Sequence, residues 1–183
     1  MPLVPGGVFV PEGPVEVTYL GLPLDPRGST TVDTHDLPAP TEGLVLTHFI
    51  TVRDVARSRL FYADIFGGKV VLEENPGIVK VANGWIIMNP GGGSTPDKPG
   101  VTLAPPERGD PVSSFLNVRV ADIAAFHAEA TAKGAEFLTG PLDRKAEMRC
   151  YLRDPDGHLI EVGQATGMLE GVYADPPPHP GAR

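Results

Sequence analysis

The feature that most constrains this chain is a loose internal repeat of one strand-to-helix corner. The segments Val52-Arg53-Asp54-Val55 and Val120-Ala121-Asp122-Ile123 have the same order of apolar and acidic residues, 68 positions apart. In each copy an alternating apolar segment precedes the Asp, and an apolar stripe at helical spacing follows it. Because Asp is a favoured N-cap residue, each copy predicts a strand and then a helix that begins directly after the Asp.

Short strands follow each predicted helix, so each copy has the order β-α-β-β-β. The first helix is expected to stop at Gly67-Gly68, within a module whose strands are predicted over 46–52, 69–72, 78–82 and 85–88. The second is expected to stop at Gly134, within a module whose strands are predicted over 113–120, 136–138, 147–152 and 158–163. One helix cannot cover both faces of a sheet. The two modules are therefore expected to form an α+β domain with a curved mixed sheet around a concave cleft and helices on the outer face.

Proline and glycine, 21 and 22 residues of 183, set the predicted domain boundaries, because proline crowds both ends of the chain. Such ends bury too little apolar surface to offset the entropy of ordering them. The boundaries predicted are an extension over 1–44, a domain over 45–167 with modules at about 45–89 and 113–167, and a loose tail over 168–183. In the extension, 15–20 alternates with β-forming residues and is predicted to lie on a sheet edge or on a partner subunit.

Composition excludes several classes of protein. The net charge of −8 argues against nucleic-acid or anionic-membrane partners, since no excess of Lys and Arg is present to neutralise phosphates. The apolar runs are too short to span a bilayer, and the first residues lack the pattern of a secretory signal. Cys150 is the only cysteine, which excludes an intrachain disulfide, favours a reducing cytoplasm and is expected to be a small buried hydrophobe.

Two segments carry a resemblance to a known family. The first is Thr47-His48-Phe49-Ile50-Thr51-Val52-Arg53-Asp54, followed by Ser58-Arg59-Leu60-Phe61-Tyr62. The second runs from Cys150 to Glu161 and consists of a strand, a tight Asp-Pro-Asp-Gly turn, and a strand with a carboxylate four positions after the Gly. Together they resemble the vicinal oxygen chelate superfamily, the group of glyoxalases, bleomycin-resistance proteins and extradiol dioxygenases. The resemblance covers about 120 residues and implies the paired modules predicted above.

The resemblance also implies a site inside the cleft. Such proteins often hold a divalent metal with side chains from the first and last strand of each module, and the metal acts as a Lewis acid on a substrate with two neighbouring oxygens. On this chain the matching positions are His48, Met88, Leu116 and Glu161. Imidazole and carboxylate suit Zn, Ni, Mn or Fe, whereas Met and Leu do not. Because a catalytic site usually takes three protein ligands, the implied ligand set is incomplete.

Three interpretations of His48 and Glu161 stay open. They are metal ligands completed by water, substrate or another residue; a metal-free acid–base or substrate-orienting pair; or residues with a structural hydrogen-bonding role. As a site, the pair requires its imidazole and carboxylate to meet in one pocket. Asn89 and Asn117 lie one residue from implied ligand positions and are expected to face away, because side chains alternate along a strand.

The expected substrate-binding residues are mostly apolar. Met88, Leu116 and Trp85 are predicted to form core or cleft wall, which suits a hydrophobic or aromatic ligand better than a small polar one. Arg149 and Tyr151 share one face of their strand. If that face lines the cleft, Arg149 can hold an anionic substrate; otherwise its guanidinium is solvated.

Other polar residues favour structural roles. Asp154 and Asp156 are expected to form hydrogen bonds within their own turn. The 91–94 segment is rich in glycine but lacks the Lys and the following helix of a phosphate loop. The remaining histidines are expected at helix caps, rims or in solvent: His35, His127, His158 and His179.

Two functional hypotheses follow. The first is a glyoxalase-like lyase, isomerase or dioxygenase acting on a small organic molecule, with His48 and Glu161 at the reacting centre. The second is a metal-free binding module of the bleomycin-resistance type that sequesters an apolar or aromatic small molecule. In either case a homodimer is predicted, with 15–20 reaching across to the partner.

Overall fold

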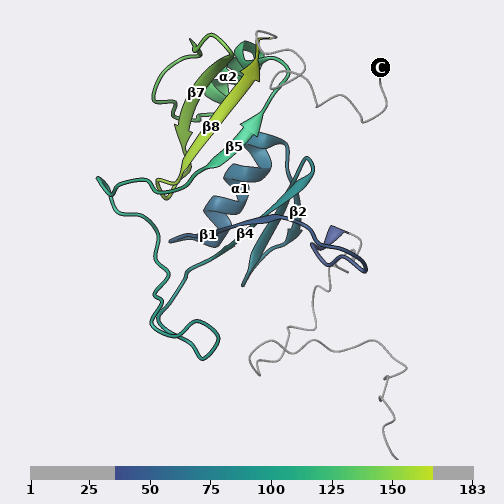
Figure 1. Cartoon of the computed structure of the whole chain (residues 1–183), viewed down its shortest axis with the longest axis vertical. Coiled ribbons are helices and arrows are strands. Elements are labelled where there is room, and N and C mark those ends of the chain that lie inside the picture. Colours follow the sequence, from purple (N-terminus) through teal and green to yellow (C-terminus); the bar gives the residue numbers. More distant parts are fainter. Residues whose placement is uncertain (1–35, 167–183) are drawn as a thin grey trace, which may run out of the picture. The chain divides into compact units, whose positions relative to one another are not determined.

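The computed structural model describes residues 36–166, which fall within one compact unit of the chain. Both predicted modules are present and both have the order β-α-β-β-β (Figure 1). The prediction of a strand over 15–20, the placements of His35 and His179, and the tail over 168–183 lie outside the described residues. No helix in the described range is both long and apolar enough to cross a membrane.

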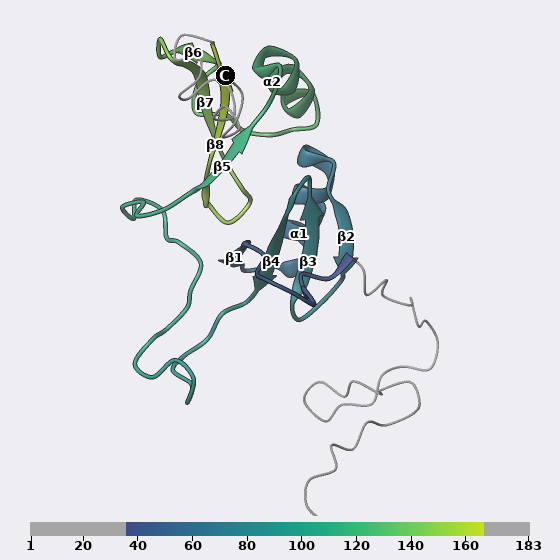
Figure 2. The same cartoon turned by 45° about the vertical axis from the view of Figure 1, so that its right-hand side comes forward.

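The first module is a four-stranded sheet with one helix. Its strands lie in the order β1-β4-β3-β2, with β1 parallel to β4 and the other neighbours antiparallel (Figure 2). The elements are β1 (Thr47–Thr51), α1 (Val55–Phe66), β2 (Lys69–Leu72), β3 (Gly77–Val81) and β4 (Gly84–Asn89). Each lies within one or two residues of its predicted range.

The second module repeats this arrangement, with strand order β5-β8-β7-β6. Its elements are β5 (Leu116–Arg119), α2 (Ile123–Ala132), β6 (Leu142–Asp143), β7 (Glu147–Arg153) and β8 (Leu159–Ala165). The strand predicted over 136–138 is wrong. That segment makes a single bridge, Phe137 to Leu152, and β6 forms instead where Leu142 pairs with Arg149.

Both helices begin and end as their flanking residues predict. The Asp54 carboxylate accepts a hydrogen bond from Arg57 N, and the Asp122 carboxylate accepts one from Ala125 N, each at 2.9 Å. These bonds satisfy backbone donors that the first turn of a helix leaves unpaired. α1 ends at Gly67, whose φ of 63° is a left-handed conformation that glycine adopts without a side-chain clash.

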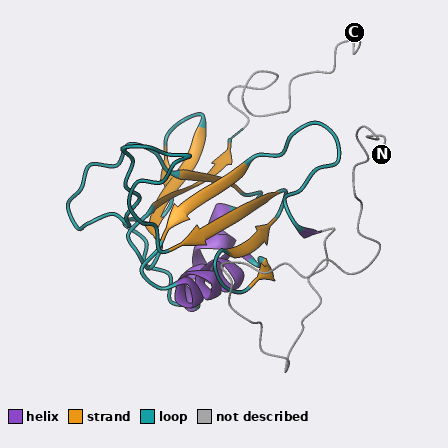
Figure 3. Cartoon of the chain, turned by 90° about the horizontal axis from the view of Figure 1, so that it is seen from below, coloured by secondary structure: helices purple, strands orange, loops and turns teal. Residues whose placement is uncertain are grey.

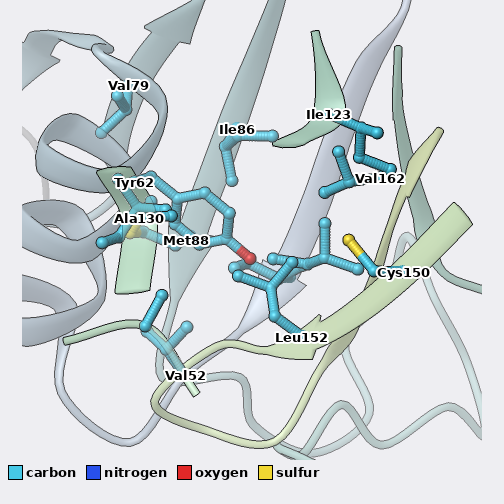
Figure 4. Close-up of a cluster of buried hydrophobic side chains, with 14 residues drawn as sticks. Val52, Tyr62, Val79, Ile86, Met88, Ile123, Ala130, Cys150, Leu152 and Val162 are labelled. Atoms are coloured by element: carbon cyan, nitrogen blue, oxygen red, sulfur yellow. The ribbon is translucent and has the colours of Figure 1, made fainter. Parts of the chain in front are cut away.

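The hydrophobic core lies between the helices and the sheets and joins the two modules. Both helices lie on the same side of the strands (Figure 3). The core contains fully buried side chains from both modules, among them Tyr62, Met88, Leu152 and Val162 (Figure 4). Cys150 is fully buried as predicted, and burial raises the pKa of its thiol to about 11, so the thiol stays protonated at neutral pH.

The Asp-Pro-Asp-Gly turn fastens the second module to the first. Asp154 accepts hydrogen bonds from the backbone N–H groups of Asp156 and His158, which confirms the predicted bonding within the turn. It also accepts one from the buried Tyr62 hydroxyl of α1 at 3.0 Å. Asp156 accepts one from the Ser58 hydroxyl at 2.8 Å. Both carboxylates therefore connect the β7–β8 turn to α1 of the other module.

Candidate functional site

Side-chain alternation gives each sheet a core face and an opposite face, called here the open face. In β8, Ile160 and Val162 are fully buried in the core, so Glu161 lies on the open face. In β1, Ile50 lies in the core, and His48 shares its face. No hydrogen bond or ion pair joins His48 to Glu161 within the described chain. His48 therefore lies on the core face of the first sheet, and Glu161 lies on the open face of the second.

Glu161 is the centre of a polar network on the open face of the second sheet. One carboxylate oxygen accepts a hydrogen bond from the Asn117 amide, and the other accepts one from the Tyr151 hydroxyl. These neighbours leave Glu161 only 5% exposed. The prediction that Asn117 faces away from Glu161 is wrong. The register pairs Asn117 with Glu161 and Leu116 with Ile160, so Leu116 faces the core.

Arg149 lies on the same open face as Glu161, which was one of the two alternatives for its strand. Its guanidinium lies 3.6 Å from a Glu161 carboxylate oxygen and 3.3 Å from the Tyr151 hydroxyl. It also forms an ion pair with Glu147. Hydrogen bonding to Tyr151 is the largest cause of the raised pKa of Arg149, ahead of the opposing effect of burial. Arg149 is therefore a fixed positive charge beside Glu161.

This donor set does not fit a divalent metal. Both oxygens of Glu161 already accept hydrogen bonds, from Asn117 and Tyr151, and the adjacent Arg149 guanidinium would repel a cation. In the part of the chain that the structure describes, no three His, Cys, Asp or Glu side chains are grouped so that they could hold a metal ion. Residues 36–166 therefore offer no matching ligand set for Zn, Ni, Mn or Fe, the ions that the resemblance implied.

His48 lines a cavity of about 180 Å³ at the seam where the two modules meet. The cavity lies between β1 of the first module and the start of β8 in the second. Its walls combine apolar and polar side chains: His48, Phe49, Ile50, Thr51, Leu103, Ser114, Phe115, His158 and Leu159. We call it the seam cavity. Since its walls come from both modules and their linker, it exists only when the modules are docked.

The imidazole of His48 is predominantly neutral at neutral pH. Burial lowers its pKa below the ordinary 6.5, and the nearby His158 lowers it further, whereas Asp154 acts in the opposite direction. A neutral imidazole offers one donor and one acceptor to a ligand. His48 is thus suited to bind an uncharged polar group rather than an anion.

His158 helps to close the seam cavity, a role that the sequence did not indicate. Its Nε2 lies 2.7 Å from the Thr51 carbonyl oxygen. A carbonyl only accepts, so Nε2 carries the proton and donates across the seam. His158 was expected at a rim or a cap, and its ring instead connects β1 to the second module.

Phe115 connects the seam cavity to the Glu161 network. It lines the cavity, and its ring meets Tyr151 edge-on with ring centroids 6.1 Å apart. The Tyr151 hydroxyl in turn donates to Glu161. Phe115, Ser114 and Leu103 were not predicted as site residues. They lie in or near the connection between modules, where no local pattern signals which residues return to the cavity.

The other predicted site residues have different surroundings. Met88 is fully buried in the core, where it pairs with Ile50, and has no surface open to a ligand. Trp85 lies on the open face of the first sheet, and its indole N–H donates to the Asp36 carbonyl oxygen at 2.7 Å. Of all the predicted site residues, His48 alone lines the seam cavity, and none of the four predicted substrate-binding residues does.

The paired modules, their interlocking turn and a small cavity at the seam define a class of α+β proteins built from two β-α-β-β-β units. The model of the Glyoxalase/Bleomycin resistance protein/Dioxygenase superfamily matches residues 44–162. That match covers well over half of the chain, and the chain belongs to this superfamily. No curated protein matches it significantly in sequence.

Solved structures share the fold at low sequence identity. An integron cassette protein from V. cholerae is 21% identical, with a TM-score of 0.52, covering 68% of this chain and 97% of that one. TnmS3, an antibiotic-binding protein from Streptomyces sp. CB03234, is 19% identical, with a TM-score of 0.51, covering 70% and 100%. Lactoylglutathione lyase from Agrobacterium tumefaciens is 16% identical, with a TM-score of 0.53, covering 72% and 99%.

Proposed function

We propose that this protein binds a small, uncharged aromatic molecule in the seam cavity without a metal ion. The observation that supports this proposal is the composition of the cavity wall, in which Phe49 and Phe115 lie together with the neutral imidazole of His48. Binding pockets for small molecules typically combine apolar walls with a few polar groups that orient the ligand. This is the binding hypothesis made from the sequence, with a different set of wall residues.

The wall chemistry indicates the class of ligand. Phe49 and Phe115 are each 44% exposed, so both rings have surface left to contact an aromatic ligand. His48 and Ser114 supply hydrogen-bonding groups without a full charge. A phenol-like molecule, with one aromatic ring and one or two hydroxyl groups, matches both features.

In this proposal Glu161 and Tyr151 are positioning residues. The Glu161 carboxylate accepts a hydrogen bond from the Tyr151 hydroxyl, and the Tyr151 ring packs edge-on against Phe115. Arg149 neutralises Glu161, which allows the carboxylate to stay buried. The antibiotic-binding protein TnmS3 has the same fold, and a binding role for this chain is consistent with that likeness.

A second candidate function is a metal-free enzyme in which His48 is a general base. The lowered pKa of His48 favours this candidate, because it leaves the imidazole able to accept a proton at neutral pH. Under the binding proposal, a phenolic probe is recovered unchanged after incubation with the protein. If the wild type converts the probe and His48→Gln does not, the enzyme hypothesis is supported and the binding proposal is contradicted.

Saturation-transfer NMR with phenol and catechol tests the binding proposal. The wild type is expected to give saturable signals that EDTA leaves unchanged. Phe115→Ala is expected to weaken binding by about tenfold, since an aromatic contact is worth about 0.5–1.5 kcal/mol beyond its buried area. Leu60→Ala, which truncates an exposed apolar side chain of α1, is the matched control. Absence of saturable binding, its loss with EDTA, or an unchanged affinity in Phe115→Ala would contradict the proposal.

A further inference from the structure

A cluster of two lysines and a tryptophan lies on the open face of the first sheet, and none of the three lines the seam cavity. The register places Lys69 of β2 beside Lys80 of β3, and Lys80 beside Trp85 of β4. The three side chains therefore form a row across neighbouring strands. The Lys80 ammonium lies 5.6 Å from the centroid of the Trp85 ring, within range of a cation–π contact.

Asp36 occupies this row from outside the sheet. One carboxylate oxygen accepts a hydrogen bond from Lys80 Nζ at 2.9 Å, and the other forms an ion pair with Lys69. The Asp36 carbonyl oxygen also accepts the Trp85 indole N–H at 2.7 Å. The side chain of Asp36 is only 16% exposed. One acidic residue thus contacts all three members of the row.

The chemistry of the row is that of a carboxylate-binding site. Two ammonium groups on adjacent strands repel each other unless an anion lies between them, and the two oxygens of a carboxylate can each take one ammonium. The sheet β1-β4-β3-β2 contains no strand from residues 36–44, so Asp36 is not held by strand pairing. It is held by the side chains of Lys69, Lys80 and Trp85. Asp36 also precedes residue 44, where the match to the superfamily begins.

We propose that Lys69, Lys80 and Trp85 form a binding site for small organic carboxylates, and that Asp36 occupies this site as a tethered competitor. A free carboxylate takes the position of the Asp36 side chain, with one oxygen on each lysine and its organic part beside the Trp85 ring. The site does not depend on ligand binding in the seam cavity. It gives the segment before the matched region a role in controlling access to the sheet.

The experiment uses the full chain and the fluorescence of Trp85, the only tryptophan in the sequence. Sodium benzoate is titrated into the wild type, Asp36→Ala, and Asp36→Ala combined with Lys80→Gln. Asp36→Ala is expected to bind benzoate about tenfold or more tightly than the wild type, because a tethered group competes at an effective concentration in the mM range. The additional Lys80→Gln change is expected to reverse that gain.

Two controls make the result specific. Asp64→Ala removes one exposed carboxylate of α1 and is expected to bind benzoate as the wild type does. Benzyl alcohol has a similar ring but no charge and is expected to leave Trp85 emission unchanged in Asp36→Ala. Circular dichroism verifies that each variant is folded, with Asp36→Asn as the replacement if Asp36→Ala is not. Equal benzoate affinity in the wild type and Asp36→Ala, or no loss of affinity with Lys80→Gln, would overturn the proposal. A change in Trp85 emission of Asp36→Ala with sodium chloride as large as that with sodium benzoate would also overturn it.

Discussion

At the scale of single residues, Asp156 joins the two modules through hydrogen bonds to three residues of the first module. Its side chain is fully buried, and it accepts hydrogen bonds from Ser58, from the backbone N–H of Arg53 and from the Arg57 guanidinium at 3.0 Å. Burial by itself raises the pKa of Asp156, but these bonds and the charge of Arg57 outweigh it and lower the pKa. The ionised carboxylate is therefore part of the folded structure.

Replacing Asp156 with Asn tests this role. The amide keeps the size of the side chain but removes the charge and places an N–H group against donors. We expect a loss of about 3 kcal/mol in the free energy of unfolding, the cost of breaking a buried charged hydrogen-bond network. Urea denaturation measures it, with Asp64→Asn as the exposed control. A change below about 1 kcal/mol, the worth of a surface ion pair, would show that the turn does not lock the modules.

Asp36 gives a pH dependence with a defined sign. Hydrogen bonds from Lys69 and then Lys80 lower its pKa from 3.8 to about 2. The ionised carboxylate of Asp36 stabilises the docked segment at pH values above its unperturbed pKa of 3.8. This contribution is lost as the pH falls through the lowered pKa of the folded protein. Trp85 emission is expected to change between about pH 4 and pH 2 in the wild type. The same scan of Asp36→Ala should lack this change, and a transition common to both proteins would assign it to another group.

At the scale of elements, the junction between α1 and β2 depends on close packing at Gly68. A Cβ atom there would lie 2.5 Å from Val79 Cγ1 and 3.1 Å from the Tyr62 carbonyl oxygen. Both neighbours belong to the core of the first module, so neither can move without disturbing the helix or β3.

Gly68→Ala is therefore expected to lower the free energy of unfolding by about 1–3 kcal/mol, the usual cost of overpacking a core. Gly84→Ala is the matched control, since its Cβ would meet its nearest neighbour at 3.9 Å, an ordinary contact. Thermal unfolding of both variants measures the difference. Equal melting temperatures would show that the α1–β2 junction has room for a methyl group.

Local sequence predicted the elements well and their pairing less well. Asp54 and Asp122 cap their helices by hydrogen bonds to backbone N–H groups three residues later, and Gly67 ends α1 by its own left-handed φ. Because these interactions are local, the sequence predicts the helix ends. The register between β5 and β8 depends on two distant segments. A shift of one residue there exchanges Asn117 for Leu116 beside Glu161. No feature near either residue indicates which of the two alternatives holds.

At the scale of the whole molecule, the repeat predicted the paired modules but not what lies between them. The sequence predicts hydrogen bonds within the Asp-Pro-Asp-Gly turn, whereas the carboxylates of this turn also accept hydrogen bonds from α1 of the other module. The seam cavity takes Leu103 and Ser114 from the connection between modules. Contacts of this kind form when the two modules dock against each other. The sequence pattern of each module predicts its own strands and helix but not these contacts.

The homodimer remains a prediction at this scale. Leu44 and Leu46, beside the edge strand β1, are 79% and 84% exposed, and a partner subunit would cover such apolar side chains. Sedimentation equilibrium is expected to give twice the chain mass of 19.4 kDa. Leu46→Glu should shift the equilibrium toward the monomer. A wild type that sediments as a monomer across the concentration range would contradict the prediction.

Phenol titrated into ¹⁵N-labelled protein, followed by amide chemical shifts, tests most directly whether the seam between the modules is the binding site. We expect saturable shifts concentrated at Thr51, Ser114 and His158, which line the cavity from three segments of the chain. The same shifts should be smaller in Phe115→Ala at equal phenol concentration, since its binding is expected to be about tenfold weaker. Shifts that cluster on another surface, or that never saturate, would contradict a binding site at the seam.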